Sequence, residues 1–451
     1  MKFRVFTGIL VSLGLGAGAA CGQVSTKDDA FGSVATLLRD VPQTDAVPAM
    51  GLDQAEQIAL EENPEIEAAV RRVAMARAHV PAAGALDDPV AMYRGWGVPL
   101  KKPWDYNAAQ NMFSVSQTFA GGSKRNLRTS IAESDVDQAQ ANLDAVRLNM
   151  RIRVRKAFYD LMLSQDETRI HRQHVAIAQQ AIGAARIKYT SGNVPQQDVL
   201  KAQVALTGLA EHMIHFDRDA EIARARLNVL LGRTPDAPLQ VRGEHAVSAS
   251  LPSADSLMEM ARNTRPDLLA AKAAAERSHK EQQLAKKAYA PDLTLSAGYM
   301  VMPTGQDFRN GYMVEASMNL PWLNRKKHDA EISEARFKSS EQDAELAALG
   351  NTARGQIAEA LAEAQSAQKL ALLYQQHLKT QAEATLRSSV IAYENNKTGF
   401  LDLLDSQMRV IDIDLAWVQA MGDFDARLAD LEMTVGRPVD KLWQMNPEVK
   451  R

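Results

Sequence analysis

Four histidines are the residues whose type and spacing are best suited to hold a metal ion. They form two pairs on either side of a break in a long helical pattern, His171 with His174 before it and His212 with His215 after it. The i, i+3 spacing places both members of a pair on one helix face, and the two pairs are equally far from the break. If the two helices pack antiparallel, four imidazoles meet at one height, which predicts a zinc or copper site. The alternative is that histidines scattered on a long polar coiled coil bind nothing.

Motifs for catalysis are absent from the sequence. We find no phosphate-binding loop, no Gly-x-Ser-x-Gly, no His-Glu-x-x-His and no paired cysteines. A net charge of −3 and a pI near 6.3 argue against nucleic-acid binding, which needs a basic surface. The sequence therefore indicates a protein that is no enzyme, needs no cofactor and binds no nucleic acid.

One motif occurs twice and divides the chain. Residues 189–200 read Tyr-Thr-Ser-Gly-Asn-Val-Pro-Gln-Gln-Asp-Val-Leu, and residues 393–404 read Tyr-Glu-Asn-Asn-Lys-Thr-Gly-Phe-Leu-Asp-Leu-Leu, at an offset of 204. The pair Gly232-Arg233 recurs as Gly436-Arg437 at the same offset. We interpret the chain as two copies of one unit, each of which turns around its own tip.

Long helices are expected on both sides of each tip. The stretches 124–189 and 325–393 contain no proline and little glycine, and each would form a helix about 100 Å long at roughly 1.5 Å per residue. Apolar residues follow each other at three and four positions, as in coiled coils. The segments 198–231 and 400–435 return from the tips, so the helical part is predicted to be a set of antiparallel hairpins.

Four short segments alternate between apolar and polar residues. They are 90–98, 112–119, 292–301 and 312–320, two in each repeat. Strands of about ten residues with one apolar face are typical of membrane β-barrels, although two-stranded hairpins packed on a soluble core can show the same pattern. Four strands cannot close a barrel, and lipid does not tolerate open sheet edges. Three chains that share twelve strands would satisfy both constraints.

The N-terminus reads as a secretory signal peptide. Lys2 and Arg4 precede an apolar run and small residues up to residue 20, and the run is too short to span a membrane. Cys21, the only cysteine, resembles the lipid-accepting residue of a bacterial lipoprotein, although Gly18 stands where such sites usually carry an aliphatic residue. The alternative is ordinary cleavage nearby without lipid.

These features together resemble the TolC-like outer-membrane efflux factors over nearly all of the mature chain. The resemblance is carried by the two tip motifs, the Leu227-Asn-Val-Leu-Leu-Gly-Arg ending, the Ser114-Val-Ser-Gln-Thr-Phe strand with Gly121-Gly-Ser-Lys-Arg after it, and the lipoprotein-like start. It implies a mainly α protein with a membrane β-barrel, in which long antiparallel coiled-coil hairpins form a periplasmic tunnel and each chain gives four strands to a twelve-stranded trimeric barrel. The Asp88-Pro89 region and the first tip are most similar to the heavy-metal efflux branch.

The resemblance also assigns roles at the tips. It implies that Asp402 and Asp405 ring the periplasmic entrance, where carboxylates select cations, and that Tyr393 and Asp198 tie the inner and outer hairpins closed. Helix caps and solvated turn residues are the alternative reading of the acidic pair. The residues expected to contact an adaptor are Gly192, Asn193, Val194 and Pro195 in the first tip and Asn396, Lys397, Thr398 and Gly399 in the second.

The predicted organisation follows the repeats. It comprises a signal peptide (1–20), an N-terminal extension (21–50), a first repeat (51–235), an equatorial connector (236–252), a second repeat (253–437) and a C-terminal tail (438–451).

The resemblance implies an outer-membrane channel of a tripartite efflux system. Such a channel is a lipid-anchored homotrimer in contact with outer-membrane lipid, and it spans into the periplasm. It receives substrates from an inner-membrane pump of the RND type through a periplasmic adaptor. The alternative from another class is a structural periplasmic coiled-coil or adaptor-like protein, in which the alternating strands would be soluble.

Overall fold

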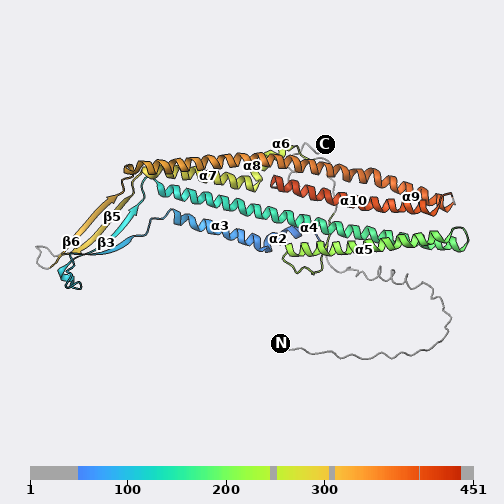
Figure 1. The fold of residues 1–451 in the computed structure, drawn as a ribbon, viewed down its shortest axis with the longest axis horizontal. Helices are drawn as coiled ribbons and strands as arrows, with labels where there is room; N and C mark the ends of the chain where they lie inside the picture. The colour runs from blue at the N-terminus through green and yellow to red at the C-terminus, as the bar shows by residue number, and fades with distance from the viewer. Residues whose placement is uncertain (1–48, 244–250, 304–309, 396, 438–451) are drawn as a thin grey trace, which may run out of the picture.

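The computed structural model describes residues 49–243, 251–303, 310–395 and 397–437. The fold is a long bundle of helices with a small sheet at one end and two helical tips at the other (Figure 1). The expected signal peptide and Cys21 lie outside the described residues, as do Asn396 and the expected C-terminal tail.

The first repeat begins with two short helices and contains one very long one. Its elements are β1 (Ala49–Met50), α2 (Leu52–Glu62), α3 (Pro64–Ala83), β2 (Val90–Trp96), a 3-10 turn (Tyr106–Ala108), β3 (Gln110–Phe119), α4 (Lys124–Thr190), α5 (Gln196–Leu230) and β4 (Gln240–Val241). The break between α2 and α3 follows from Asn63, whose side chain accepts a hydrogen bond from the Glu65 N–H at 2.8 Å, and from Pro64, which fits the first turn of a helix.

The second repeat follows the same plan. Its elements are α6 (Ala254–Thr264), α7 (Pro266–Lys286), a 3-10 turn (Lys287–Tyr289), β5 (Leu293–Val301), β6 (Asn310–Met318), a second 3-10 turn (Pro321–Asn324), α8 (Arg325–Leu373), a π turn (Tyr374–Leu378), α9 (Lys379–Glu394) and α10 (Phe400–Val435). The helix predicted over 325–393 is therefore present but contains a π turn. Such turns widen a helix locally by one residue.

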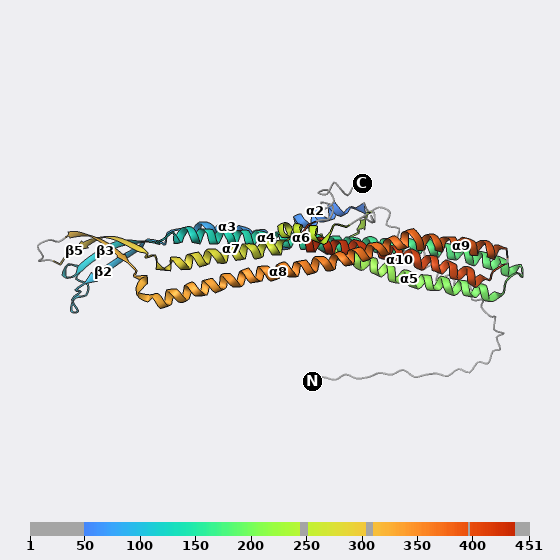
Figure 2. The same ribbon diagram turned by 90° about the horizontal axis from the view of Figure 1, so that it is seen from above.

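The helices lie side by side in two sets of four. Near the sheet the order is α3, α4, α7, α8, and near the tips it is α5, α4, α10, α9, so α4 runs through both sets (Figures 1 and 2). The antiparallel hairpins predicted from the sequence are thus confirmed. No helix of the described segments is both long and apolar enough to cross a membrane.

A buried ion cluster holds α4 against its neighbours where the two sets meet. Arg155 is 6% exposed and donates to both oxygens of Glu432 on α10, at 2.6 and 2.7 Å. It also bonds Glu56 on α2, which forms an ion pair with Arg151 as well, at 3.0 Å. Around this cluster, Phe158 and Leu161 of α4 pack with apolar residues of α2, α3 and α5.

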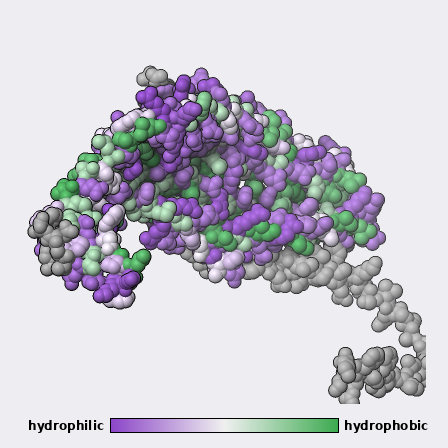
Figure 3. Space-filling view, turned by 60° about the vertical axis from the view of Figure 1, so that its left-hand side comes forward, coloured by the Kyte–Doolittle hydropathy of each residue, from purple (hydrophilic) through white to green (hydrophobic). Residues whose placement is uncertain are grey.

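The four strands form one antiparallel sheet in the order β2, β3, β5, β6. The pairing of β3 with β5 joins the two repeats, so the two hairpins are not separate units. One face of the sheet is apolar and exposed, with Tyr93, Phe113, Tyr299 and Tyr312 in one row across all four strands. The predicted alternation is confirmed in β5 and β6, whereas β2 carries the apolar Val90, Met92 and Trp96 on the opposite face. Hydrophobic residues gather at this end of the molecule, whereas the helical body is mostly hydrophilic in the same view (Figure 3).

Candidate functional site at the helical tips

The first tip is a tight, fully hydrogen-bonded turn. Gly192 has the left-handed φ of +76°, which glycine adopts without strain. The Asn193 N–H donates to the Lys188 carbonyl at 2.9 Å and the Gly192 N–H to the Tyr189 carbonyl at 3.0 Å. This pair of bonds is the Schellman motif that ends many helices. Pro195 then starts α5, so the exposed turn has a defined shape.

The second tip repeats part of this geometry. The Lys397 N–H donates to the Ala392 carbonyl at 2.8 Å, over the same separation as Asn193 and Lys188. Gly399 is the N-cap of α10, and its N–H donates to the Asp402 carboxylate at 3.3 Å. Asp402 therefore has a local structural role as a first-turn carboxylate.

Asp402 and Asp405 lie on one face of the first two turns of α10. Both side chains are exposed, and the i, i+3 spacing makes them neighbours on the helix surface. Capping uses one oxygen of Asp402, and the exposed remainder of both carboxylates faces solvent in the single chain.

Tyr393 is the buried centre of the tips. Its side chain is 7% exposed and its ring centroid lies 5.9 Å from that of Phe400. Burial, and then the negative charge of nearby Asp198, raises the pKa of Tyr393. The structure therefore brings Tyr393 and Asp198 near each other across the two hairpins. Within the described residues, however, the Tyr393 hydroxyl has no hydrogen-bond partner, so the expected tie is not formed here.

Lys188 is a tip residue that the sequence did not reveal. Its Nζ lies 3.9 Å from the Tyr393 ring centroid and donates to the Tyr393 carbonyl at 2.9 Å. It therefore connects α4 of the first hairpin to the end of α9 in the second, through a cation–π contact and a charged hydrogen bond. Comparison of the repeats could not find it, because Ala392 stands at the equivalent position.

The four histidines do not converge, so the predicted four-histidine metal site is wrong. His171 Nε2 donates to the Leu209 carbonyl on α5 at 2.8 Å, and His174 Nε2 lies 3.4 Å from Asp414 on α10. His212 and His215 are exposed. Within the described ranges no three His, Cys, Asp or Glu side chains are grouped to hold a metal ion. The physical reason is that α4 packs between two helices, and its two histidines face different ones.

His174 belongs instead to a polar contact between the hairpins. Asp414 on α10 lies between His174 on α4 and Lys379 on α9, whose Nζ is 3.1 Å away. Burial raises the pKa of Asp414, but hydrogen bonds from His174 and Lys379 outweigh burial and leave that pKa below its usual value. The contact lies directly beside the π turn.

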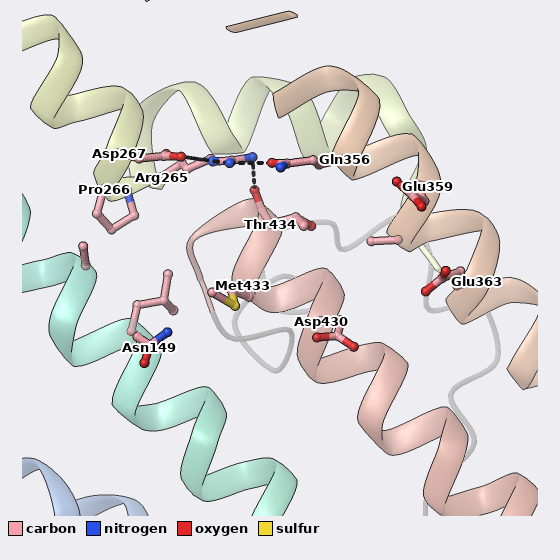
Figure 4. Close-up of a pocket in the computed structure, with 13 residues that line it drawn as sticks. Asn149, Arg265, Pro266, Asp267, Gln356, Glu359, Glu363, Asp430, Met433 and Thr434 are labelled. Atoms are coloured by element: carbon pink, nitrogen blue, oxygen red, sulfur yellow. Dashed lines mark hydrogen bonds and ion pairs between the residues drawn. The ribbon is translucent and has the colours of Figure 1, made fainter. Parts of the chain in front are cut away.

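A groove of about 500 Å³ lies between α4, α7, α8 and α10 (Figure 4). Arg265 at its edge donates to both oxygens of Asp267, at 2.7 and 2.8 Å, to Gln356 at 2.6 Å and to the Thr434 carbonyl at 3.3 Å. The guanidinium thus makes these hydrogen bonds at the junction where α10 ends and α7 begins. We interpret the groove as part of that junction.

The fold and the paired tips define a class of elongated channel proteins, and comparison with known proteins agrees. The family model for outer membrane efflux proteins matches residues 56–233 and 257–437. The chain belongs to this family. It is an outer-membrane channel that serves efflux and extends into the periplasm, which decides against the adaptor-like alternative.

Individual relatives place the chain near metal-resistance proteins. It is 23% identical to the cobalt-zinc-cadmium resistance protein CzcC of Cupriavidus metallidurans over 70% of this chain and 74% of that protein. It is 25% identical to the nickel-cobalt-cadmium resistance protein NccC of Alcaligenes xylosoxydans xylosoxydans over 51% and 52%. The solved structure of CusC shares the fold with a TM-score of 0.70 at 17% identity, over 88% of this chain and 97% of that one.

Proposed function

We propose that three copies of this chain form one efflux channel, which receives substrate from an inner-membrane pump through a periplasmic adaptor. The observation that carries the proposal is that each chain has two opposite sides that no other described part of the same chain covers. The strands β2 and β6 are the sheet edges, and α3 with α5 and α8 with α9 are the outer helices on the same two sides. The first-repeat side of one copy can meet the second-repeat side of the next. Such head-to-tail contacts form a closed ring.

The sheet supports this arrangement. Four strands cannot close a barrel, and unpaired edges are not tolerated in lipid. The row of Tyr93, Phe113, Tyr299 and Tyr312 resembles the aromatic girdle of membrane barrels. From Phe113 to Phe119 on the same face, β3 covers about 20 Å at about 3.3 Å per residue, which suits an apolar band in the outer membrane.

At the tips, we propose that Asp402 and Asp405 of three chains form two carboxylate rings at the periplasmic entrance. Lys188 and Tyr393 would then join the two hairpins of each chain beside the rings, with Asp198 close to Tyr393. Rings of carboxylates favour cations over anions.

A conductance experiment tests the gate. The double variant Asp402→Ala, Asp405→Ala in planar bilayers should lose cation selectivity and block by multivalent cations. Asp423→Ala, an exposed carboxylate on the same helix but far from the tip, is the matched control and should behave as the wild type. Unchanged selectivity in the double variant would show that the two aspartates act only as helix caps and solvated turn residues.

The turns at the tips are the proposed adaptor contacts. The described residues among them are Gly192, Asn193, Val194, Pro195, Lys397, Thr398 and Gly399, and the proposal also includes Asn396 from the sequence. A photo-crosslinking residue at position 193 should capture a periplasmic protein in cells, whereas one at position 350, in the middle of α8, should not. Capture from both positions alike would contradict docking at the tips.

We further propose that the cargo is a heavy-metal cation, since CzcC and NccC are named for resistance to such metals. Deletion of the gene should sensitise cells to cobalt, zinc or cadmium rather than to organic drugs. The reverse pattern would reject a metal cargo and leave the channel assignment intact.

Lipidation of Cys21 is a separate proposal, supported by its place after the small residues of the signal peptide. Labelled palmitate should enter the wild type and not Cys21→Ser. Equal absence of label from both proteins would establish ordinary cleavage.

A further inference from the structure

Four methionines lie together on the polar face of the sheet. Met112 on β3 is directly opposite Met300 on β5. Met92 on β2 pairs with Ser114, two residues from Met112, and Met313 on β6 pairs with Gly298, two residues from Met300. Because paired residues and residues two apart share a face of a sheet, all four side chains lie on the face opposite the aromatic row.

The register places methionines on neighbouring strands within reach of each other, with Met112 and Met300 at the centre. Directly opposite Cβ atoms in an antiparallel pair lie about 4.5–5.5 Å apart, and diagonal neighbours about 7–8 Å apart. Methionine has three rotatable bonds, so thioether sulfurs from neighbouring strands can converge on one atom. Met112 is 8% exposed and Met92 is 40% exposed, so the patch extends from a shielded centre to an accessible edge.

The surroundings of the patch carry little net charge. Arg94 donates to the Met92 sulfur at 3.5 Å, and Gln110 donates to the Met300 sulfur. Glu315 lies on the same face, two residues from Met313. One cationic and one anionic side chain therefore flank the four neutral sulfurs, and what distinguishes the patch chemically is its thioethers.

We propose that Met112 and Met300, which are directly opposite each other, hold a soft monovalent cation, Cu(I) or Ag(I), on the channel wall, with Met92 and Met313 as the neighbouring thioethers on the two sides. Thioethers select Cu(I) over the harder divalent metals, because the sulfur is neutral and polarisable. The inference rests on the proposed trimer in one respect, namely that the polar face lines the lumen. In that assembly three patches surround one passage.

The test is titration of the full-length protein, purified in detergent, with Ag(I), which needs no reductant. Calorimetry of the wild type is compared with Met112→Leu, Met300→Leu, since leucine keeps the volume and removes the sulfur. We expect affinity for Ag(I) to fall at least tenfold. The matched control is Met318→Leu, which removes a sulfur from the opposite face of β6 and should bind as the wild type. Zn(II) should not compete.

Two results would overturn the site. One is equal Ag(I) affinity of the wild type and the double variant, and the other is equal competition by Zn(II). Conductance in planar bilayers, measured on the same samples, separates this inference from the proposed function. A double variant that conducts normally but loses Ag(I) isolates the thioether patch, whereas a wild type that does not conduct rejects the channel while the binding comparison still decides the site.

Discussion

At the residue scale, Arg155 stabilises the contact between the three helices α2, α4 and α10. Its guanidinium is buried between Glu56 and Glu432, which are 8% and 1% exposed. Breaking a buried ion pair leaves an unpaired charge in a low dielectric, which costs about 3–5 kcal/mol. The pairing of three helices at one guanidinium therefore makes this residue sensitive to substitution.

We expect Arg155→Met to lower the free energy of unfolding by about 3–5 kcal/mol, because the buried Glu432 loses its bond to this guanidinium and Glu56 keeps only Arg151 of its two arginines. Denaturant titration followed by helical circular dichroism measures the loss. Arg71→Met is the control, since Arg71 and Glu67 form an exposed pair that contributes at most about 1 kcal/mol. Similar losses in the two variants would contradict the role of burial.

His171 makes stability depend on pH. Burial lowers its pKa, the hydrogen bond to the Leu209 carbonyl opposes this, and the charges of His212 and His174 add to the lowering. The pKa in the folded state is thus below the unfolded value of about 6.5. Stability from neutral His171 is complete above pH 6.5 and is lost as the pH falls from there toward the folded pKa, because the unfolded chain binds the proton first.

The variant His171→Gln should therefore lose less thermal stability than the wild type between pH 7 and pH 5. Glutamine can still donate to the Leu209 carbonyl but does not titrate in this range. His215→Gln, at an exposed position, should keep the wild-type profile. If His171→Gln shows the wild-type drop, the acid sensitivity arises elsewhere.

The spacing in the sequence showed that these histidines lie on helices. It did not show which side chains surround them. The i, i+3 rule correctly placed His171 and His174 on one stretch of α4. It could not show that α4 has packing partners on two sides, because that depends on contacts with α10, more than 200 residues away in the chain. Lys188 was missed for a related reason: its partner Tyr393 lies in the other repeat.

At the scale of elements, the junction between strands and helices depends on Gly121. A Cβ at this position would lie 1.9 Å from the Pro291 carbonyl oxygen, which is backbone and cannot rotate away. The Gly121 N–H also donates to Asp292 at 2.8 Å, and Lys124 donates to the same carboxylate oxygen at 2.8 Å. The end of β3 and the start of β5 are thus held in one arrangement.

We expect Gly121→Ala to reduce the yield of folded protein and its unfolding temperature, because the β3–β5 pairing must shift. Gly350→Ala is the matched control. No atom outside its own helix lies near Gly350, and alanine in a helix interior is favoured by about 1 kcal/mol over glycine. Its stability should equal or exceed that of the wild type. Two variants of equal stability would show that the junction is not sterically closed.

Most elements could be predicted because their signals are local. The glycine that ends α10, Gly436, and the alternation in β5 and β6 are visible within ten residues of sequence. The π turn had no such signal, since Tyr374–Leu378 contains neither proline nor glycine. The helix that contains the π turn is also the longer of the two: α4 has 67 residues, whereas α8, the π turn and α9 have 49, 5 and 16, three more in total.

At the scale of the whole molecule, α5 carries an apolar seam that its own chain does not cover. Its exposed members are Leu200, Val204, Ile214, Ile222 and Val229. At 3.6 residues per turn they lie along one side of the helix. The opposite edge of the chain also exposes apolar residues on α8 and α9, namely Leu370, Leu373, Val390 and Ile391. The two edges suit each other in a head-to-tail ring.

Val204→Asp combined with Ile214→Asp should convert the proposed trimer in detergent to monomers, because two charges would be buried in the seam between copies. Native mass spectrometry measures the change. A trimer that survives the double variant would place the contacts between copies on another surface.

The unequal tips have a consequence for the stoichiometry of any partner. A ring of three chains presents six tips, but they are of two kinds, since the first has Gly192 and Pro195 and the second has Lys397 and Asp405. The ring therefore has true threefold and only approximate sixfold symmetry. A partner with six identical subunits must bind in two alternating environments, so its subunits would dissociate in two classes of three.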